Sequence, residues 1–96
     1  MREPVNKARG EVLLDIDGRP QRLCVTLGAL ADLEGAFDVA SLAELGERLA
    51  HLTASDLITV LAALSGASTA ELARADIDPK AAAHAVAEAF RAAFDE

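Results

Sequence analysis

The sequence contains no tryptophan and no tyrosine, and its three aromatic residues are phenylalanines. Proteins that bind single-stranded nucleic acid stack bases on aromatic side chains and attract the phosphates with a positive groove. Here the formal net charge is −7, and residues 23–96 hold 12 acidic and four basic side chains. Because an acidic surface repels phosphates, we expect no nucleic-acid partner.

Cysteine and histidine are almost as scarce. Cys24 is the single cysteine, which excludes an internal disulfide, and His51 and His84 are the only other soft metal ligands. A structural zinc site takes four ligands at characteristic spacings, which these three residues do not provide. A serine or cysteine nucleophile would need one of the same two isolated histidines as its base. We expect no metal, no cofactor and no enzymatic activity.

Long hydrophobic runs are also missing. The longest uncharged stretch, Leu57–Ala70, has 14 residues. That is shorter than the roughly 18–20 apolar residues that cross a bilayer. The first four residues, Met1–Pro4, include the charged Arg2 and Glu3 and lack the apolar run of a secretory signal. We therefore expect no membrane partner and a cytoplasmic location.

Alanine, in contrast, is abundant and makes up 22 of the 96 residues. It is the best helix former but buries little area per residue, so the composition favours a helical frame around a thin core. A chain of this length fits one small domain. Residues 1–9 show no periodicity, and we expect them to form a flexible tail before a single compact domain over residues 10–96.

Two segments with alternating polarity flank the dipeptide Asp17-Gly18, which is a strong signal for a β-hairpin turn. They predict a hairpin over residues 11–26 with one apolar face. Two strands alone are marginally stable in water, so the helices that follow must cover this face. The residues expected on it are Val12, Leu14, Ile16, Leu23, Val25 and Leu27.

Helix-start signals divide the rest of the chain. Thr26 is a candidate N-cap, and capping-box patterns begin at Ser41, Thr53 and Ser68. Pro79, directly after an aspartate, is typical of a first helical position. The predicted helices cover about 27–37, 41–51, 54–65, 69–75 and 79–94. The residues expected to face inward in the first two are Leu27, Leu30, Ala31, Leu33, Phe37, Leu42, Leu45 and Leu49.

The predicted fold class is therefore α+β: an N-terminal β-hairpin packed on a small bundle of four to five short α-helices. A small acidic helical domain is also reminiscent of an acyl carrier protein, whose modified serine follows an aspartate at a helix start. Here alanine precedes both candidate serines, Ser41 and Ser55, and that fold has no hairpin. A small acidic carrier or adaptor domain is kept as an alternative function, ranked below the two that are given next.

The hairpin turn and the segment after it resemble a known family. Asp17-Gly18-Arg19-Pro20, followed by Leu23 to Glu34, is similar to the small tail proteins of gene transfer agents. That family is grouped with tail assembly chaperones, and its members are sometimes labelled tail tube proteins. The resemblance covers roughly residues 10–65. The residues that carry it are Asp17, Gly18, Arg19, Pro20, Thr26, Leu27, Gly28, Leu30, Leu33 and Glu34.

The resemblance implies a non-enzymatic tail assembly chaperone of a gene transfer agent or prophage. Such a chaperone binds the tape-measure protein, the tail tube protein, or both, and self-association is left open. The alternative is a structural component of the tail, which would place the chain in phage-like particles. Tail tube proteins stack rings of β-sheet, whereas this chain has a single predicted hairpin, and we therefore rank the chaperone first.

The candidate partner-binding residues are apolar side chains on two of the predicted helices. Over residues 54–65 the helix is apolar on more than one face, so it forms either an accessible groove or the buried centre of the bundle. Near the C-terminus two phenylalanines follow each other at helical spacing. The candidates are Leu57, Ile58, Leu61, Phe90 and Phe94.

Overall fold

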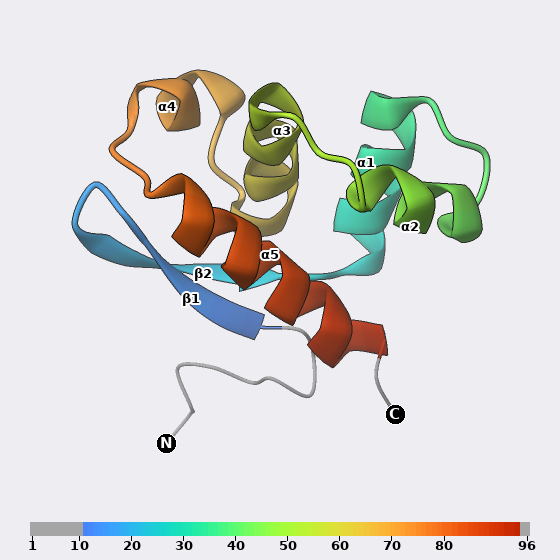
Figure 1. Ribbon diagram of the computed structural model, residues 1–96, viewed down its shortest axis with the longest axis horizontal. Helices are drawn as coiled ribbons and strands as arrows, with labels where there is room; N and C mark the ends of the chain where they lie inside the picture. Colours follow the sequence, from blue (N-terminus) through green and yellow to red (C-terminus); the bar gives the residue numbers. More distant parts are fainter. Residues whose placement is uncertain (1–10, 95–96) are drawn as a thin grey trace.

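The computed structural model describes residues 11–94, so the tail predicted for residues 1–9 lies outside them. The described chain is a β-hairpin followed by five helices (Figure 1), which confirms the predicted α+β class. The elements are β1 (Glu11–Ile16), β2 (Arg19–Cys24), α1 (Leu27–Phe37), α2 (Leu42–Leu49), α3 (Ala54–Ser65), α4 (Thr69–Arg74) and α5 (Pro79–Phe94).

The hairpin turns on two residues. β1 and β2 pair antiparallel, and Ile16 lies opposite Arg19 at the end of the ladder. Asp17 and Gly18 between them have φ angles of 57° and 78°. Two positive φ values define a type I′ turn, whose twist matches that of the flanking strands. This geometry explains the aspartate–glycine pair, because few other residues adopt such angles at low cost.

The tip of the hairpin is tied to a distant part of the chain. The Asp17 N–H donates to the carbonyl oxygen of Asp76 at 3.0 Å. In return, the Asp76 N–H donates to Oδ1 of Asp17 at 2.7 Å. Asp76 lies in the connection between α4 and α5, so these two bonds fix the turn against the C-terminal part of the bundle.

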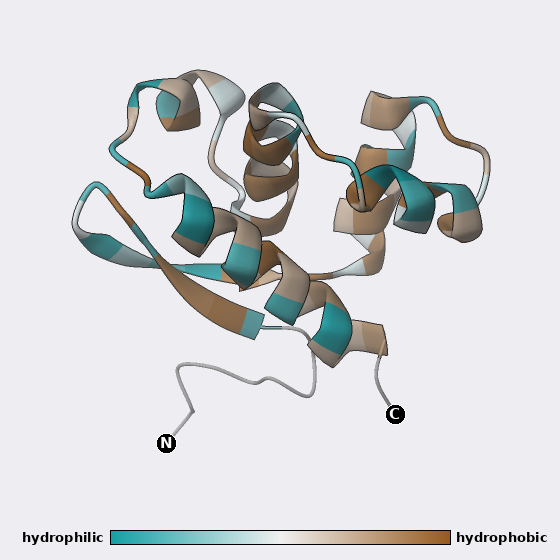
Figure 2. Cartoon of the chain, in the orientation of Figure 1, coloured by the Kyte–Doolittle hydropathy of each residue, from teal (hydrophilic) through white to brown (hydrophobic). Residues whose placement is uncertain are grey.

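One face of the hairpin forms the floor of the core. α5 packs mainly on β1, and α3 packs on β2. α5 runs across the hairpin in Figure 1. Figure 2 shows hydrophobic residues concentrated on β1 and α3, while hydrophilic residues recur along the side of α5 that faces the viewer. The hairpin residues buried in this layer are Val12, Leu14, Ile16 and Leu23.

The predicted N-caps occupy helix starts. Thr26 Oγ1 accepts the N–H of Ala29 at 3.0 Å, and complete capping boxes open α3 at Thr53 and α4 at Ser68. At α2, Ser41 accepts from the N–H of Glu44, but the Glu44 carboxylate binds the N–H of Ala40 instead of that of Ser41. The box predicted there is therefore incomplete.

Some inward assignments were wrong. Leu27 is 82% exposed and Leu42 is 49% exposed, and Ala31 is exposed as well. Leu27 and Leu42 are each the first residue of a helix, where the chain has just left its N-cap and no earlier turn lies beside them. The buried side of α1 is set instead by Ala29, Leu30 and Leu33, and α2 buries Leu45.

Candidate interaction surface

Helix α3 is the centre of the bundle. It packs against α1, α4, α5 and β2, and Val60, Leu61 and Leu64 on it are buried. Of the two interpretations of its apolar faces, the buried one therefore holds for most of the helix. Leu61, with an exposed fraction of 1%, does not present its side chain to a partner in this conformation.

The other two α3 candidates reach the surface in part. Leu57 and Ile58 are half-buried and line a shallow pocket of about 190 Å³ where α3, the end of α4 and the start of α5 meet. All of its lining residues are apolar, and they include Leu61, Ile77 and Pro79. This hollow is the part of α3 that an apolar side chain of another molecule could enter.

The two phenylalanines of α5 form a second feature. Phe90 is half-buried and lines a pocket of about 300 Å³ together with Leu49 and Leu52 of the α2–α3 region. Phe94 lies one turn later and is 56% exposed. The two rings stack with centroids 6.2 Å apart and planes inclined by 14°, so an aromatic pair reaches from the pocket to the solvent.

The structure thus brings all five candidates to two hollows beside α5. Leu57, Ile58 and Leu61 line the first, Phe90 lines the second, and Phe94 stacks on Phe90. Pro79 and Ala82 at the start of α5 border the first pocket, and Ala83 and Val86 border the second. Successive turns of α5 therefore contribute to both hollows, and Leu61, which lines the first, is almost completely buried.

Within residues 11–94, sequence reasoning missed three of the four exposed large hydrophobic side chains. Besides Phe94, the exposed large hydrophobic residues are Leu13 on β1, Leu27 at the start of α1 and Leu42 at the start of α2. Leu13 gave a signal in advance, because it breaks the polar–apolar alternation of its strand. The other two follow an N-cap, a position where apolar residues are easily taken for core.

The residues shared with the family motif have structural roles in this fold. Asp17 and Gly18 form the turn, Thr26 caps α1, and Leu30 and Leu33 lie in the core. In the turn and on the surface of α1, the remaining motif residues are exposed or half-buried: Arg19, Pro20, Leu27, Gly28 and Glu34. The motif residues therefore form the hairpin turn and the start of α1, where the Leu27 side chain is exposed.

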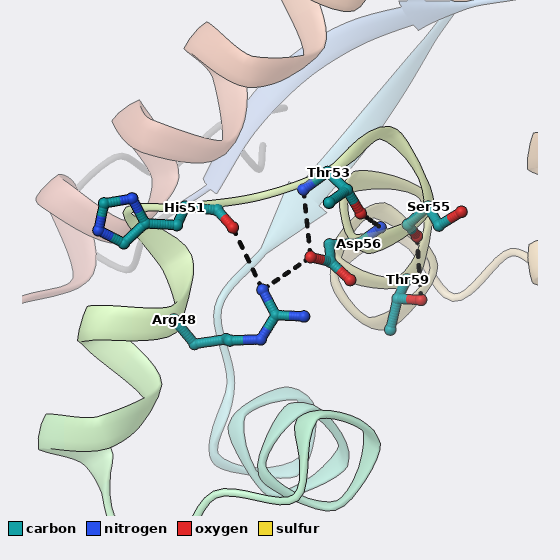
Figure 3. Close-up of polar contacts among 6 residues, drawn as sticks. All are labelled: Arg48, His51, Thr53, Ser55, Asp56 and Thr59. Atoms are coloured by element: carbon teal, nitrogen blue, oxygen red, sulfur yellow. Dashed lines mark hydrogen bonds and ion pairs between the residues drawn. The ribbon is translucent and has the colours of Figure 1, made fainter.

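A polar cluster joins three helices (Figure 3). Arg48 Nη1 lies 2.7 Å from Oδ2 of Asp56 and donates to the carbonyl oxygen of His51 at 3.2 Å. Its guanidinium carbon lies 4.8 Å from the ring centre of Phe37. Asp56 Oδ2 also accepts the N–H of Thr53 at 3.1 Å. Arg48 on α2 therefore contacts the last residue of α1 and the first turn of α3.

This cluster sets the ionisation of one carboxylate. The hydrogen bond from Arg48, followed by that from the backbone of Thr53, holds the pKa of Asp56 below its ordinary value. Both donors bind the charged form of the carboxylate more strongly than the neutral form. Among the described residues, no three or more histidine, cysteine, aspartate or glutamate side chains are grouped as metal ligands. Through the contacts of Arg48 with Phe37 of α1 and Asp56 of α3, the cluster fastens α2 to its neighbours.

None of the helices in residues 11–94 combines the length and hydropathy that a bilayer crossing requires.

Comparison with known proteins adds the family. A family model described as "Phage tail tube protein, GTA-gp10" matches residues 9–95. Curated proteins and solved structures gave no match to the chain. The family match extends past residue 65, where the resemblance drawn from motifs ended, and takes in the whole of α4 and α5. With nearly its whole length matched, the chain belongs to the GTA-gp10 family of phage tail tube proteins.

Proposed function

We propose that the protein is a structural component of the tail of a phage-like particle and has no enzymatic activity. The observation that carries this proposal is the family match over residues 9–95. The family's description names a tail tube protein, and that supports the structural alternative more directly than the chaperone that the sequence resemblance ranked first. Location in the assembled particle is part of the proposal.

The distribution of exposed apolar residues is compatible with this role. Leu13, Leu27, Leu42 and Phe94 lie on four different elements. A subunit that is surrounded by neighbours in an assembly needs contacts on several sides, whereas a carrier of one ligand needs one groove. The scattered pattern therefore favours a component that is held in place from more than one direction.

The shortage of β-structure limits what the chain can do alone. Its sheet has two strands in the described residues, and a tube wall built of β-sheet requires continuous pairing between strands. We infer that the subunit contributes to such a wall only by joining strands from other chains.

Quantitative mass spectrometry of purified particles tests the proposal. We expect the intact chain in the particles at a constant ratio to the other tail proteins, through successive purification steps and after a salt wash. A chain that is present in the producing cells but absent from the purified particles would overturn the structural role.

The chaperone is the second candidate, and the two apolar pockets beside α5 favour it. The pockets formed around Leu57 and Phe90 have the character of sites that accept apolar side chains from a helix. For this function, co-expression should keep the tape-measure protein of the same particle soluble. Phe94→Ser should weaken that effect more than Ala81→Ser, a change on the exposed side of α5 outside both pockets. Stoichiometric recovery of the chain from particles would count against it.

A further inference from the structure

The two outer edges of the hairpin are not equivalent. In a two-residue turn the residues at either end, here Ile16 and Arg19, form a hydrogen-bonded pair. Antiparallel pairs alternate between hydrogen-bonded and non-hydrogen-bonded along the ladder. The pairs Leu13–Arg22 and Asp15–Pro20 are therefore of the second kind, and their backbone groups point away from the partner strand.

On β1 these outward groups include the N–H and C=O of both Leu13 and Asp15. On β2 one of the two corresponding positions is Pro20, which has no N–H to donate. No third strand pairs with either edge within residues 11–94. Proline on an exposed edge strand commonly blocks pairing with a further strand, whereas an edge without such a block can pair with one. β1 therefore carries the open edge.

The two faces of β1 define the side chains that an added strand should carry. On the inner face, Val12, Leu14 and Ile16 are buried beneath the helices. On the outer face, Leu13 is 47% exposed and Asp15 is exposed. A neighbouring strand places its side chains alternately beside these two faces. Its inner residues should be apolar, and a basic residue beside Asp15 would be favoured.

A second copy of this chain fits the edge poorly. If two β1 strands paired antiparallel around Leu13, Glu11 of each would lie opposite Asp15 of the other, and like charges directly opposite each other are destabilising. If β1 paired with β2 of a second copy, Pro20 would interrupt the ladder. In every register, β1 also offers two acidic residues and no basic one. The basic strand favoured beside Asp15 therefore belongs to a different protein.

We propose that the outer edge of β1 binds an extended segment of another tail component, in which apolar residues alternate with lysine or arginine, as a third strand. The inference deepens the proposed function and rests on it for one point, that the partner is a tail component. The strand addition itself rests on the free backbone groups of Leu13 and Asp15, on Pro20 and on the charge of the outer face.

The test uses the full-length protein and a fluorescent peptide of alternating lysine and valine, with an alternating glutamate and valine peptide as the control. Binding is followed by fluorescence anisotropy, and the bound edge is identified by amide hydrogen exchange. We expect slower exchange at Leu13 and Asp15, and affinity at least about tenfold lower for the glutamate peptide because of like-charge repulsion.

A matched pair of variants assigns the edge. Leu13→Pro and Arg22→Pro change residues that lie opposite each other, and each removes one outward N–H. We expect Leu13→Pro to weaken lysine–valine binding by at least about tenfold, since it removes a ladder hydrogen bond from β1. Arg22→Pro should leave binding within about twofold. Circular dichroism checks that both variants are folded, and Asp15→Lys, which keeps the backbone intact, should reverse the preference between the two peptides.

Three results would overturn the proposal: equal binding of both peptides, protection confined to β2, or no protection of the Leu13 and Asp15 amides at saturating peptide. Self-association that Leu13→Pro abolishes would also overturn it, because the occupant would then be a second copy. These measurements use no particles. Their failure is therefore distinct from absence of the chain from particles, which would contradict the proposed function.

Discussion

Helices α5 and α2 are held in the fold by different forces. α5 buries Ala82, Ala85, Val86 and Ala89, and it packs on both strands of the hairpin and on α3. α2 buries Leu45 alone, and its other anchor is the polar cluster around Arg48. Small apolar side chains let α5 lie close to the sheet, whereas α2 is held by Leu45, the partly buried Leu49 and Arg48. The sheet-side core should therefore control global stability and α2 should open locally.

The largest expected effect is on the floor of the core. Leu23 is completely buried, and Leu23→Ala should lower the free energy of unfolding by about 2–5 kcal/mol, because the cavity cannot be filled by rearrangement. The matched change Leu13→Ala, on the exposed face of the paired strand, should stay within about 0.5 kcal/mol. Urea denaturation measures both. Similar losses for the two variants would refute the assigned faces of the hairpin.

The second largest effect on stability is expected at the turn that joins the two strands of the hairpin. Gly18 has a φ of 78°, and Gly18→Val forces a β-branched residue into the left-handed region, which should cost about 1–2 kcal/mol. Gly46 in α2 has open space around it and no positive φ, so Gly46→Ala should stabilise the protein by up to about 1 kcal/mol. Thermal melting should move in opposite directions, and an unchanged melting temperature for Gly18→Val would mean that the turn assignment is wrong.

The third change probes α2 directly. Arg48→Met keeps much of the aliphatic stem but removes the contacts with Asp56, with the carbonyl of His51 and with the ring of Phe37. We expect faster amide exchange in α2 with protection of β1, β2 and α5 retained, because the hairpin core does not depend on this cluster. Arg91→Met, on the exposed surface of α5, is the control. Loss of protection throughout the molecule would contradict the proposed division.

The smallest effect is a pH dependence of the same cluster. The pKa of Asp56 is lower in the folded protein than its ordinary value, so its charged form stabilises the fold at pH values above that ordinary value. This contribution should fall as the pH drops through the folded pKa. The stability difference between the native protein and Asp56→Asn should therefore shrink on acidification below about pH 4. Denaturation curves at several pH values measure it, and a difference that grows toward acid pH would contradict the assigned sign.

The sequence predicted the features that depend on neighbouring residues. Asp17 and Gly18 indicated the turn, Thr53 and Ser68 indicated helix starts, and Pro79 indicated the first residue of α5. These signals work because turns and caps are made by side chains a few positions apart. The same local information indicated an apolar face on the hairpin, which the structure covers with α3 and α5.

Features that depend on the meeting of distant segments were not predicted. The paired hydrogen bonds of Asp17 and Asp76 join residues 59 positions apart, and no local pattern announces them. The ring contact between Arg48 and Phe37 likewise depends on how α2 turns back beside α1. Leu27 and Leu42 were assigned to the core because helical spacing identifies a stripe of residues but does not say where along the helix the neighbour begins.

The candidate partner-binding residues were chosen for their apolar character and helical spacing, and their role in binding stays a prediction. Leu57 and Ile58 line one apolar pocket beside α5, Phe90 lines a second, and Phe94 stacks on Phe90. Leu61 lines the first pocket as well, but it is a buried core residue. The open edge of β1 was not foreseen, because it depends on which backbone groups the register turns outward. Which backbone groups point outward follows from the pairing of Ile16 with Arg19, and this pairing is known only from the structure.

The most direct test of the proposed structural role is a cryo-electron microscopy map of the tail of particles from cells that produce this chain. If the protein is a structural component of the tail, density for a two-stranded hairpin crossed by the 16-residue helix α5 should recur at fixed positions in the tail. A map in which other chains account for all of the tail density, with this protein detected in the same cells, would contradict the account.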